Sequence, residues 1–250
     1  MMCVSRAACE SLPDSLLTGS VDAQADSRGV ATVRPEGGGR GTVLATASLT
    51  ARHVSGFGTE DNPLVHPVTG ERLVFRKRAR DTNGELLELN LLMAPGGFIA
   101  TPHVHPNQEE RFEVSGAQVV FRFGREERRY NPGDVVVVPA GVPHTWWNPS
   151  DAEASTLIQF RPALDMETLF ETIFGLAAAG KVNRKGLPNA LQMMVLARAF
   201  RHEAAPPPPL RWVIGPLSFA LAPIGRALGY RARYEQYSGP LPGKRDAAET

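Results

Sequence analysis

The feature that most constrains the fold is the stretch from residue 96 to 148, where histidines and carboxylates alternate with short apolar runs and turns rich in glycine and proline. His103 and His105 are two residues apart, so on a β-strand both imidazoles point to the same face. A carboxylate follows closely, and His144 stands at the start of a later apolar run. Three imidazoles and one carboxylate form a ligand set that suits a divalent transition metal.

The spacing of these residues closely resembles the two motifs of the cupin family. The first motif is a glycine, five residues, His-x-His, three or four residues, a glutamate and a later glycine, which here are Gly97, His103, His105, Glu109 or Glu110, and Gly116. The second motif is a glycine, five residues, Pro-x-Gly, two residues, a histidine, three residues and an asparagine, which here are Gly133, Pro139, Gly141, His144 and Asn148. The resemblance implies that His103, His105, His144 and one glutamate hold a metal.

The strand period indicates which of the two adjacent glutamates completes the ligand set. If Glu110 points inward, the apolar residues two and four positions later do so too, while Glu109, Arg111 and Glu113 face solvent. If Glu109 were the ligand, the two charged residues that share its face would be forced into the interior. The period therefore favours Glu110, and Glu109 stays an alternative.

The same alternation predicts an apolar and aromatic substrate pocket around the metal. Its predicted lining is Ile99, Thr101, Phe112, Phe121 and Trp146. No lysine or arginine points inward in this register, which argues against the sugar-phosphate isomerases of the wider cupin group and favours a small, apolar, planar substrate. The alternative is that these side chains only fill the barrel.

The rhythm of short apolar runs and turns predicts a mainly β fold, a small antiparallel β-barrel or jelly roll over residues 64–163, which is also the fold that the cupin resemblance implies. Asn83 and Gly84 are expected to form a hairpin turn between the first two long strands. The predicted strands are residues 73–79, 86–93, 98–105, 110–114, 118–123, 128–130, 134–138, 144–147 and 155–160.

From residue 164 to 250 the pattern becomes that of a helical extension. One helix is expected at 165–180, with Asp165 as its cap and Gly180 at its end, and a second at 189–201, before a run of prolines. The uncharged segment 212–224 is shorter than the roughly 20 residues that span a bilayer. We expect it to dock on the barrel or on a second subunit; contact with a membrane surface is the alternative.

Residues 1–63 are rich in small and polar residues and are expected to form a disordered arm, with one edge strand at 42–51.

The net charge of +1 gives no reason to expect nucleic acid. Cys3 and Cys9 make no disulfide framework, and no secretory signal is visible, so a cytoplasmic location is expected. Exposed strand edges and the cupin resemblance suggest a homodimer.

The function that this ligand set favours is that of a metal-dependent dioxygenase or related oxidoreductase acting on a small apolar, aromatic or enolisable compound. The resemblance implies Fe(II), Mn(II), Ni(II), Cu(II) or Zn(II), with Fe(II) favoured, and Glu110 is expected to accept a proton from the substrate as well. The alternatives are a non-redox isomerase or cyclase and a module that binds a small ligand without turnover. The histidines outside the motifs, His53, His66 and His202, are expected to be ordinary core or surface residues.

Overall fold

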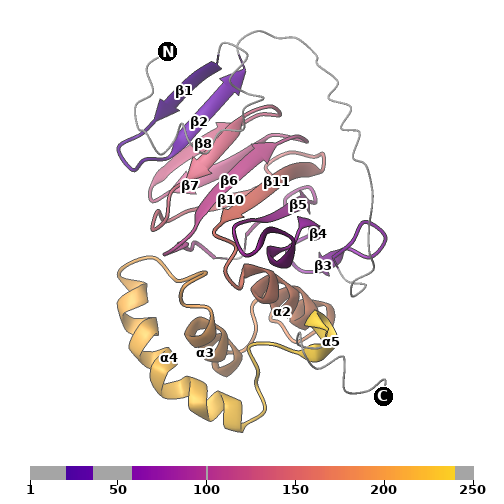
Figure 1. Cartoon of the computed structure of the whole chain (residues 1–250), viewed down its shortest axis with the longest axis vertical. Coiled ribbons are helices and arrows are strands. Elements are labelled where there is room, and N and C mark those ends of the chain that lie inside the picture. The colour runs from indigo at the N-terminus through magenta and orange to yellow at the C-terminus, as the bar shows by residue number, and fades with distance from the viewer. Residues whose placement is uncertain (1–20, 36–57, 100, 240–250) are drawn as a thin grey trace.

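The computed structural model of the chain describes residues 21–35, 58–99 and 101–239, and their strands form two facing antiparallel sheets (Figure 1). The strands are β1 (Val21–Ala25), β2 (Ala31–Pro35), β3 (Leu64–His66), β4 (Glu71–Lys77), β5 (Leu87–Met93), β6 (Glu109–Val114), β7 (Val119–Phe123), β8 (Glu126–Tyr130), β9 (Val135–Val138), β10 (Thr145–Trp147) and β11 (Ala154–Arg161). The helices are a 3₁₀ turn η2 (Ala79–Thr82), α2 (Met166–Ala178), α3 (Ala190–Ala199), α4 (Leu210–Ala227) and α5 (Glu235–Ser238).

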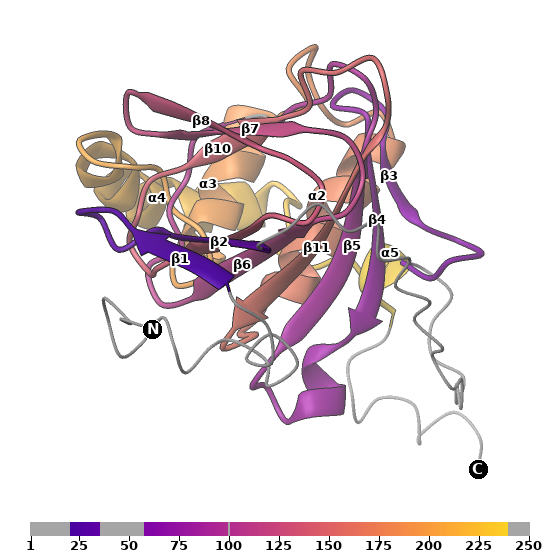
Figure 2. The ribbon, with the colours of Figure 1, turned by 90° about the horizontal axis from the view of Figure 1, so that it is seen from above.

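The two sheets enclose one apolar core. Among the described residues the larger sheet has the strand order β1-β2-β9-β6-β11-β5-β4-β3, and the smaller has the order β10-β7-β8. Figure 2 shows the small sheet lying across the curved inner face of the large one. The predicted mainly β jelly roll followed by helices is confirmed, with the strands arranged as two sheets and not as one closed barrel.

Strict alternation of apolar residues directs side chains into this core. In β5 the residues Leu87, Leu89, Leu91 and Met93 are almost completely buried, and the residues between them are only half-buried. β11 pairs with β5 on one side and with β6 on the other, and it alternates in the same way. A strand that lies between a core and an outer surface buries every second side chain, and both strands show this pattern.

One predicted strand, residues 98–105, is not a continuous strand. Its described residues form only isolated bridges, in which Phe98 pairs with Trp147, His103 with His144, and Val104 with Ala205. Pro102 lacks an N–H group, and the segment turns from one partner to another, so no ladder can extend along it. The expected hairpin turn also differs, because Asn83 and Gly84 take positive φ angles at the end of η2 and not in a two-residue loop.

The N-terminal region, expected to be a disordered arm, contains a hairpin formed by β1 and β2. β2 pairs with β9, and the outward valines of both strands form a small separate apolar cluster with Ala31. Residues 1–20 and 36–57 lie outside the described residues, and so does the edge strand predicted at 42–51.

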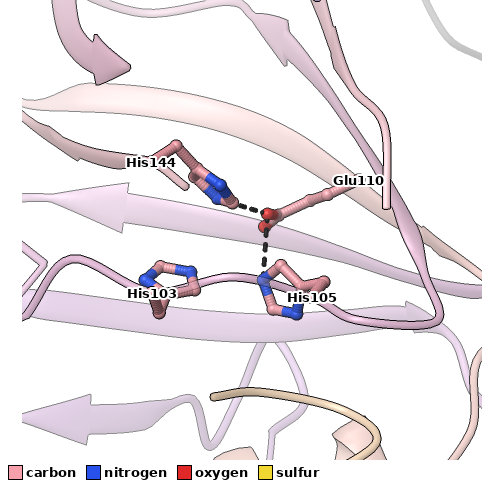
Figure 3. Close-up of side chains that lie close together, drawn as sticks. All are labelled: His103, His105, Glu110 and His144. Carbon is pink, nitrogen blue, oxygen red and sulfur yellow. Dashed lines mark hydrogen bonds and ion pairs between the residues drawn. The ribbon is translucent and has the colours of Figure 1, made fainter. Parts of the chain in front are cut away.

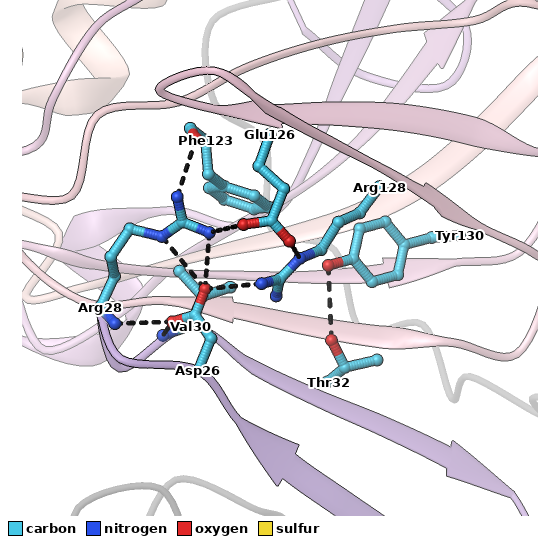
Figure 4. A network of polar contacts seen from close by, with 8 residues as sticks. All are labelled: Asp26, Arg28, Val30, Thr32, Phe123, Glu126, Arg128 and Tyr130. Carbon is cyan, nitrogen blue, oxygen red and sulfur yellow. Dashed lines mark hydrogen bonds and ion pairs between the residues drawn. The ribbon is translucent and has the colours of Figure 1, made fainter.

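A polar network holds the turn of this hairpin against the turn between β7 and β8 (Figure 4). The guanidinium of Arg28 donates to Asp26 at 2.8 Å, to Glu126 at 2.6 Å and to the carbonyl oxygen of Phe123 at 2.8 Å. Arg128 donates to the same two carboxylates. The contacts of Arg28 with Phe123 and Glu126, and of Arg128 with Asp26, join residues that are about a hundred positions apart, and local sequence patterns cannot reveal them.

The helices gather at one end of the sheets (Figure 1). The predicted helix at 165–180 is confirmed as α2, and its residues Leu169, Phe174 and Ala177 are buried. Asp165 stands at the cap position, but its side chain makes no capping hydrogen bond. The predicted second helix is α3, whose first turn is capped by the side chain of Asn189, which accepts from the backbone N–H of Gln192. Residues of both helices join the core of the sheets, so the helical extension packs directly on the β domain.

The apolar segment after the prolines forms α4, which runs on through Pro216 and Pro223 and packs against α3. None of the helices in the described part of the chain has the length and the hydrophobicity that crossing a membrane requires.

Candidate metal centre

Three segments bring the predicted ligands together. His103 and His105 lie on the segment between β5 and β6, Glu110 lies on β6, and His144 directly precedes β10. His103 and His144 exchange two backbone hydrogen bonds of 3.0 Å, which set their side chains next to each other. Figure 3 shows the three imidazoles around the carboxylate of Glu110. One ligand atom from each of these four residues lies within 4.8 Å of all the others, a spacing that could hold a metal ion.

All three imidazoles are oriented by backbone carbonyl groups. The Nδ1 atom of His103 contacts the carbonyl oxygen of Thr101 at 3.1 Å, and that of His144 contacts the carbonyl of Val142 at 3.1 Å. The Nδ1 atom of His105 contacts the carbonyl of Glu203 at 2.6 Å. A carbonyl only accepts, so each Nδ1 carries the proton and each Nε2 presents a lone pair. This is the tautomer in which a histidine can bind a metal through Nε2.

The carboxylate of Glu110 needs positive charge close to it. Its Oε2 atom lies 2.8 Å from Nε2 of His144 and 3.1 Å from Nε2 of His105. The contact between Glu110 and His105 is poorly directed. The buried Nε2 atom of His105 therefore has no hydrogen-bond partner among the described residues. A buried carboxylate facing imidazole lone pairs is costly unless a proton or a cation lies between them. The donor set therefore fits a divalent metal ion.

The pKa values of His103, His105 and Glu110 also indicate that the Glu110 carboxylate needs positive charge beside it. Burial, together with the neighbouring imidazoles, lowers the pKa of His103 to about 3. Burial alone would raise the pKa of Glu110, but His105 and His144 hold it well below its usual value. Burial also acts to lower the pKa of His105, and the charge of Glu110 outweighs it, so that this pKa is raised. The site favours a carboxylate with a cation beside it.

The site is closed on most sides. His105, Glu110 and His144 are buried, whereas His103 is partly exposed and marks the side from which a ligand would enter. Glu109 lies outside the cluster, half-buried on the opposite face of β6. Arg111, expected to face solvent, is only 3% exposed. β6 is a central strand, and Arg111 is flanked by Val137 on β9 and by Gln159 on β11, so it has a neighbouring strand on both sides.

The residues predicted to line a pocket lie in two environments. Phe112, Phe121 and Trp146 are buried and pack against one another; the rings of Phe121 and Trp146 stack with centroids 5.6 Å apart. Ile99 is partly buried against the same core, and Thr101 is exposed beside His103. The aromatic rings thus form an apolar layer behind the ligands, and the segment that carries Thr101 lies on the open side.

The motif glycines and asparagine have structural roles around the site. A Cβ atom on Gly116 would lie 2.4 Å from the backbone nitrogen of Ser155, so only glycine allows the two segments to approach. Asn148 is fully buried, and its amide donates to the carbonyls of Met93, Ala94 and Ala152. The asparagine therefore closes the end of the sheet near His144 and lies outside the candidate ligand set.

Two of the other histidines are placed as expected. His66 is buried, with its ring nitrogens bonded to the N–H of Thr69 and the carbonyl of Gly186. His202 lies at the surface against Asn107. His53 lies outside the described residues. The residue that the sequence analysis missed is Glu203, because it acts on His105 through its backbone carbonyl, which leaves no trace in residue identity.

A comparison with protein-family models matches residues 90–160 to the cupin domain. The chain contains a cupin domain. Both motifs, from Gly97 to Asn148, lie within the matched segment. The matched segment contains His103, His105, Glu110 and His144, so the metal centre belongs to the cupin domain, while Glu203, which orients His105, belongs to the helical extension.

Solved structures similar to this chain include a sugar phosphate isomerase of the cupin superfamily from Silicibacter pomeroyi, with 23% identity and a TM-score of 0.34 over 38% of this chain and 60% of that one. A predicted oxalate decarboxylase from Thermotoga maritima has 16% identity and a TM-score of 0.35 over 37% of this chain and 80% of that one. The oxalate decarboxylase of Bacillus subtilis has 18% identity and a TM-score of 0.36 over 41% and 28%. The chain thus spans 60% of the length of the Silicibacter pomeroyi protein. A comparison with curated proteins gave no match.

Proposed function

We propose that this cupin domain binds a divalent transition metal, Fe(II) in preference to Mn, Ni, Cu or Zn, and acts as a metal-dependent oxidoreductase of the dioxygenase type. The observation that carries the proposal is that three imidazoles, each held by a backbone carbonyl at Nδ1, converge with the carboxylate of Glu110 within 4.8 Å, and that Nε2 of His105 and of His144 contacts this carboxylate. On a six-coordinate metal, three neutral nitrogens and one carboxylate would leave two positions for other ligands. A metal bound there would act as a Lewis acid and as a template for substrate and dioxygen.

The substrate that fits this environment is small and apolar, aromatic or enolisable. The layer behind the ligands consists of aromatic rings, with Phe112 beside His144 and Phe160 beside His105. Such walls exclude water and favour a planar apolar molecule over a sugar phosphate, which would need cationic side chains. Entry is expected on the side of His103, where the cluster is partly exposed.

Glu110 is proposed to have a second role as a proton acceptor. Its carboxylate contacts both His105 and His144, and these groups keep it ionised at neutral pH. An ionised carboxylate within reach of a bound enol or phenol can take its proton and keep the product anion in place.

Metal content and oxygen consumption test the proposal. Protein purified without an affinity tag or chelator is expected to contain near-stoichiometric metal, and the iron-loaded form should consume oxygen with an aromatic or enolic substrate. Turnover without oxygen consumption would point to an isomerase or cyclase. A lack of metal after reconstitution would refute the proposal and leave a module that binds a small ligand.

A further inference from the structure

The helix α4 exposes an apolar face to solvent. Trp212 is 71% exposed, Phe219 64% and Val213 62%, so most of each of these side chains is open to solvent. Figure 1 shows α4 at the outer edge of the helical part, with α3 on its inner side. Further exposed apolar residues of this face are Leu210, Leu217, Ile224 and, just after the helix, Leu228. Large side chains concentrated on one exposed face indicate a binding surface.

The side of α4 that packs on the protein carries small residues. Ser218, Ala222 and Gly225 are its buried residues, and a Cβ atom on Gly225 would lie 2.7 Å from Val195 of α3. An amphipathic helix of a globular domain normally turns its large apolar residues toward the core. In α4 this is reversed, so packing within the chain does not account for the large residues.

The segment from residue 181 to 233, which includes α4, is strongly basic. From residue 181 to 233 Glu203 is the single carboxylate, and it is buried. The same region contains Lys181, Arg184, Lys185, Arg198, Arg201, Arg211, Arg226, Arg231 and Arg233. Arg198 lies over the ring of Phe219 at 4.4 Å, at the border of the apolar face. In the described part of the chain no carboxylate forms an ion pair with Arg198, Arg211 or Arg226.

These observations select the partner. We propose that α4 lies in the surface of an anionic phospholipid bilayer, with Trp212, Leu217 and Phe219 among the acyl chains and the arginines at the headgroups. A helix of 18 residues is about 27 Å long, and its apolar outer face with arginines beside it matches a helix that lies in the plane of the interface. A second copy fits less well, because twofold symmetry would bring two basic surfaces together without carboxylates.

Sedimentation of the full chain with vesicles tests the proposal. Binding is expected to vesicles of equal parts phosphatidylglycerol and phosphatidylcholine and not to vesicles of phosphatidylcholine alone. Each arginine at an anionic surface contributes roughly a fivefold change in affinity, so Arg211→Gln with Arg226→Gln should weaken binding about twentyfold. Acyl chains brominated near the headgroup should quench the fluorescence of Trp212, and Trp212→Phe should remove that quenching.

A matched pair of variants separates the face of α4 from exposed apolar residues in general. Leu217 is 41% exposed on α4, and Val65 is 42% exposed on β3. Leu217→Glu should weaken vesicle binding about tenfold or more, because it places a charge among the acyl chains, and Val65→Glu should leave it unchanged. Equal binding by the two variants, or no binding of the wild-type chain to anionic vesicles, would overturn the proposal. A dimer that Leu217→Glu dissociates, without vesicle binding, would do so too, and would identify a second copy as the partner.

Discussion

The Nδ1 atom of His105 lies 2.6 Å from the backbone carbonyl oxygen of Glu203, which joins the candidate metal centre to the segment between α3 and α4. Two backbone hydrogen bonds between Val104 and Ala205, of 2.9 and 3.0 Å, fix this carbonyl in place. The helical extension thus orients one ligand of the cupin domain, and a disturbance in the extension should reach the metal.

Replacing Ala205 by proline tests this connection. Ala205→Pro removes the N–H group that donates to the carbonyl of Val104, so the carbonyl of Glu203 should no longer hold the ring of His105. Loss of such a supporting contact typically lowers metal affinity about tenfold or more. Competition with a chromophoric chelator measures the affinity. Ala205→Gly, which keeps the N–H, is the control and should bind almost as tightly as the wild type.

The pair of adjacent glutamates gives a direct test of the ligand set. Glu110→Gln keeps the shape of the side chain but removes the charge that faces His105 and His144, so metal affinity should fall by about a hundredfold or more. Glu109→Gln changes the opposite face of β6 and should keep full metal occupancy. Elemental analysis after dialysis compares the two variants. Loss of metal from Glu109→Gln with retention in Glu110→Gln would show that the assignment is wrong.

Phe121→Ala distinguishes a core residue from a pocket residue. The ring is fully buried and stacks between Phe123 and Trp146. Its removal should lower the free energy of unfolding by about 3 to 5 kcal/mol, the usual cost of deleting a buried phenylalanine ring. Urea denaturation measures this cost, and Ile99→Ala, at a partly buried site, should show a smaller loss. A loss below about 1 kcal/mol for Phe121→Ala would mean that the ring lines open space and not the core.

Strand periodicity was sufficient to predict the elements that border the core and to place Glu110 on the inner face of β6. Glu110 and Phe112 share the inner face of β6, as the period of two requires, and α2 follows from the spacing of Leu169 and Phe174. These predictions succeed because one buried face imposes a regular pattern on the residues of a single element.

The features that the sequence did not predict depend on partners far away in the chain. The hairpin of β1 and β2 is held by contacts of Arg28 to Phe123 and Glu126, and the position of Glu203 depends on a bridge between segments a hundred residues apart. The burial of Arg111 likewise reflects its place in the middle of the large sheet. No local pattern encodes the neighbours of a strand in a sheet.

Arg28→Met tests what holds the N-terminal hairpin. The substitution removes the hydrogen bonds from Arg28 to Asp26, to Glu126 and to the carbonyl of Phe123. Each net hydrogen bond contributes about 1 kcal/mol, so amides of β2 should exchange with solvent at least about tenfold faster. Arg122→Met is the control, because Arg122 pairs with Glu127 within the hairpin of β7 and β8. Equal protection of β2 in both variants would show that the pairing with β9 alone holds the hairpin.

The buried carboxyl of Glu71 should make stability depend on pH. Burial raises its pKa from 4.5 to about 7, against the opposing effect of its hydrogen bond with the Thr69 hydroxyl. Since the folded pKa lies above the unfolded one, this stability is complete below about pH 4.5 and is lost as the pH rises through about 7. The loss should amount to about 3 kcal/mol at high pH. Glu71→Gln cannot ionise, so its stability relative to the wild type should improve as the pH rises from about 4.5 to about 7 in urea denaturation. The exposed carboxylate of Glu127 provides the control, and Glu127→Gln should follow the wild-type profile. A Glu71→Gln profile parallel to that of the wild type would mean that Glu71 stays ionised inside the fold.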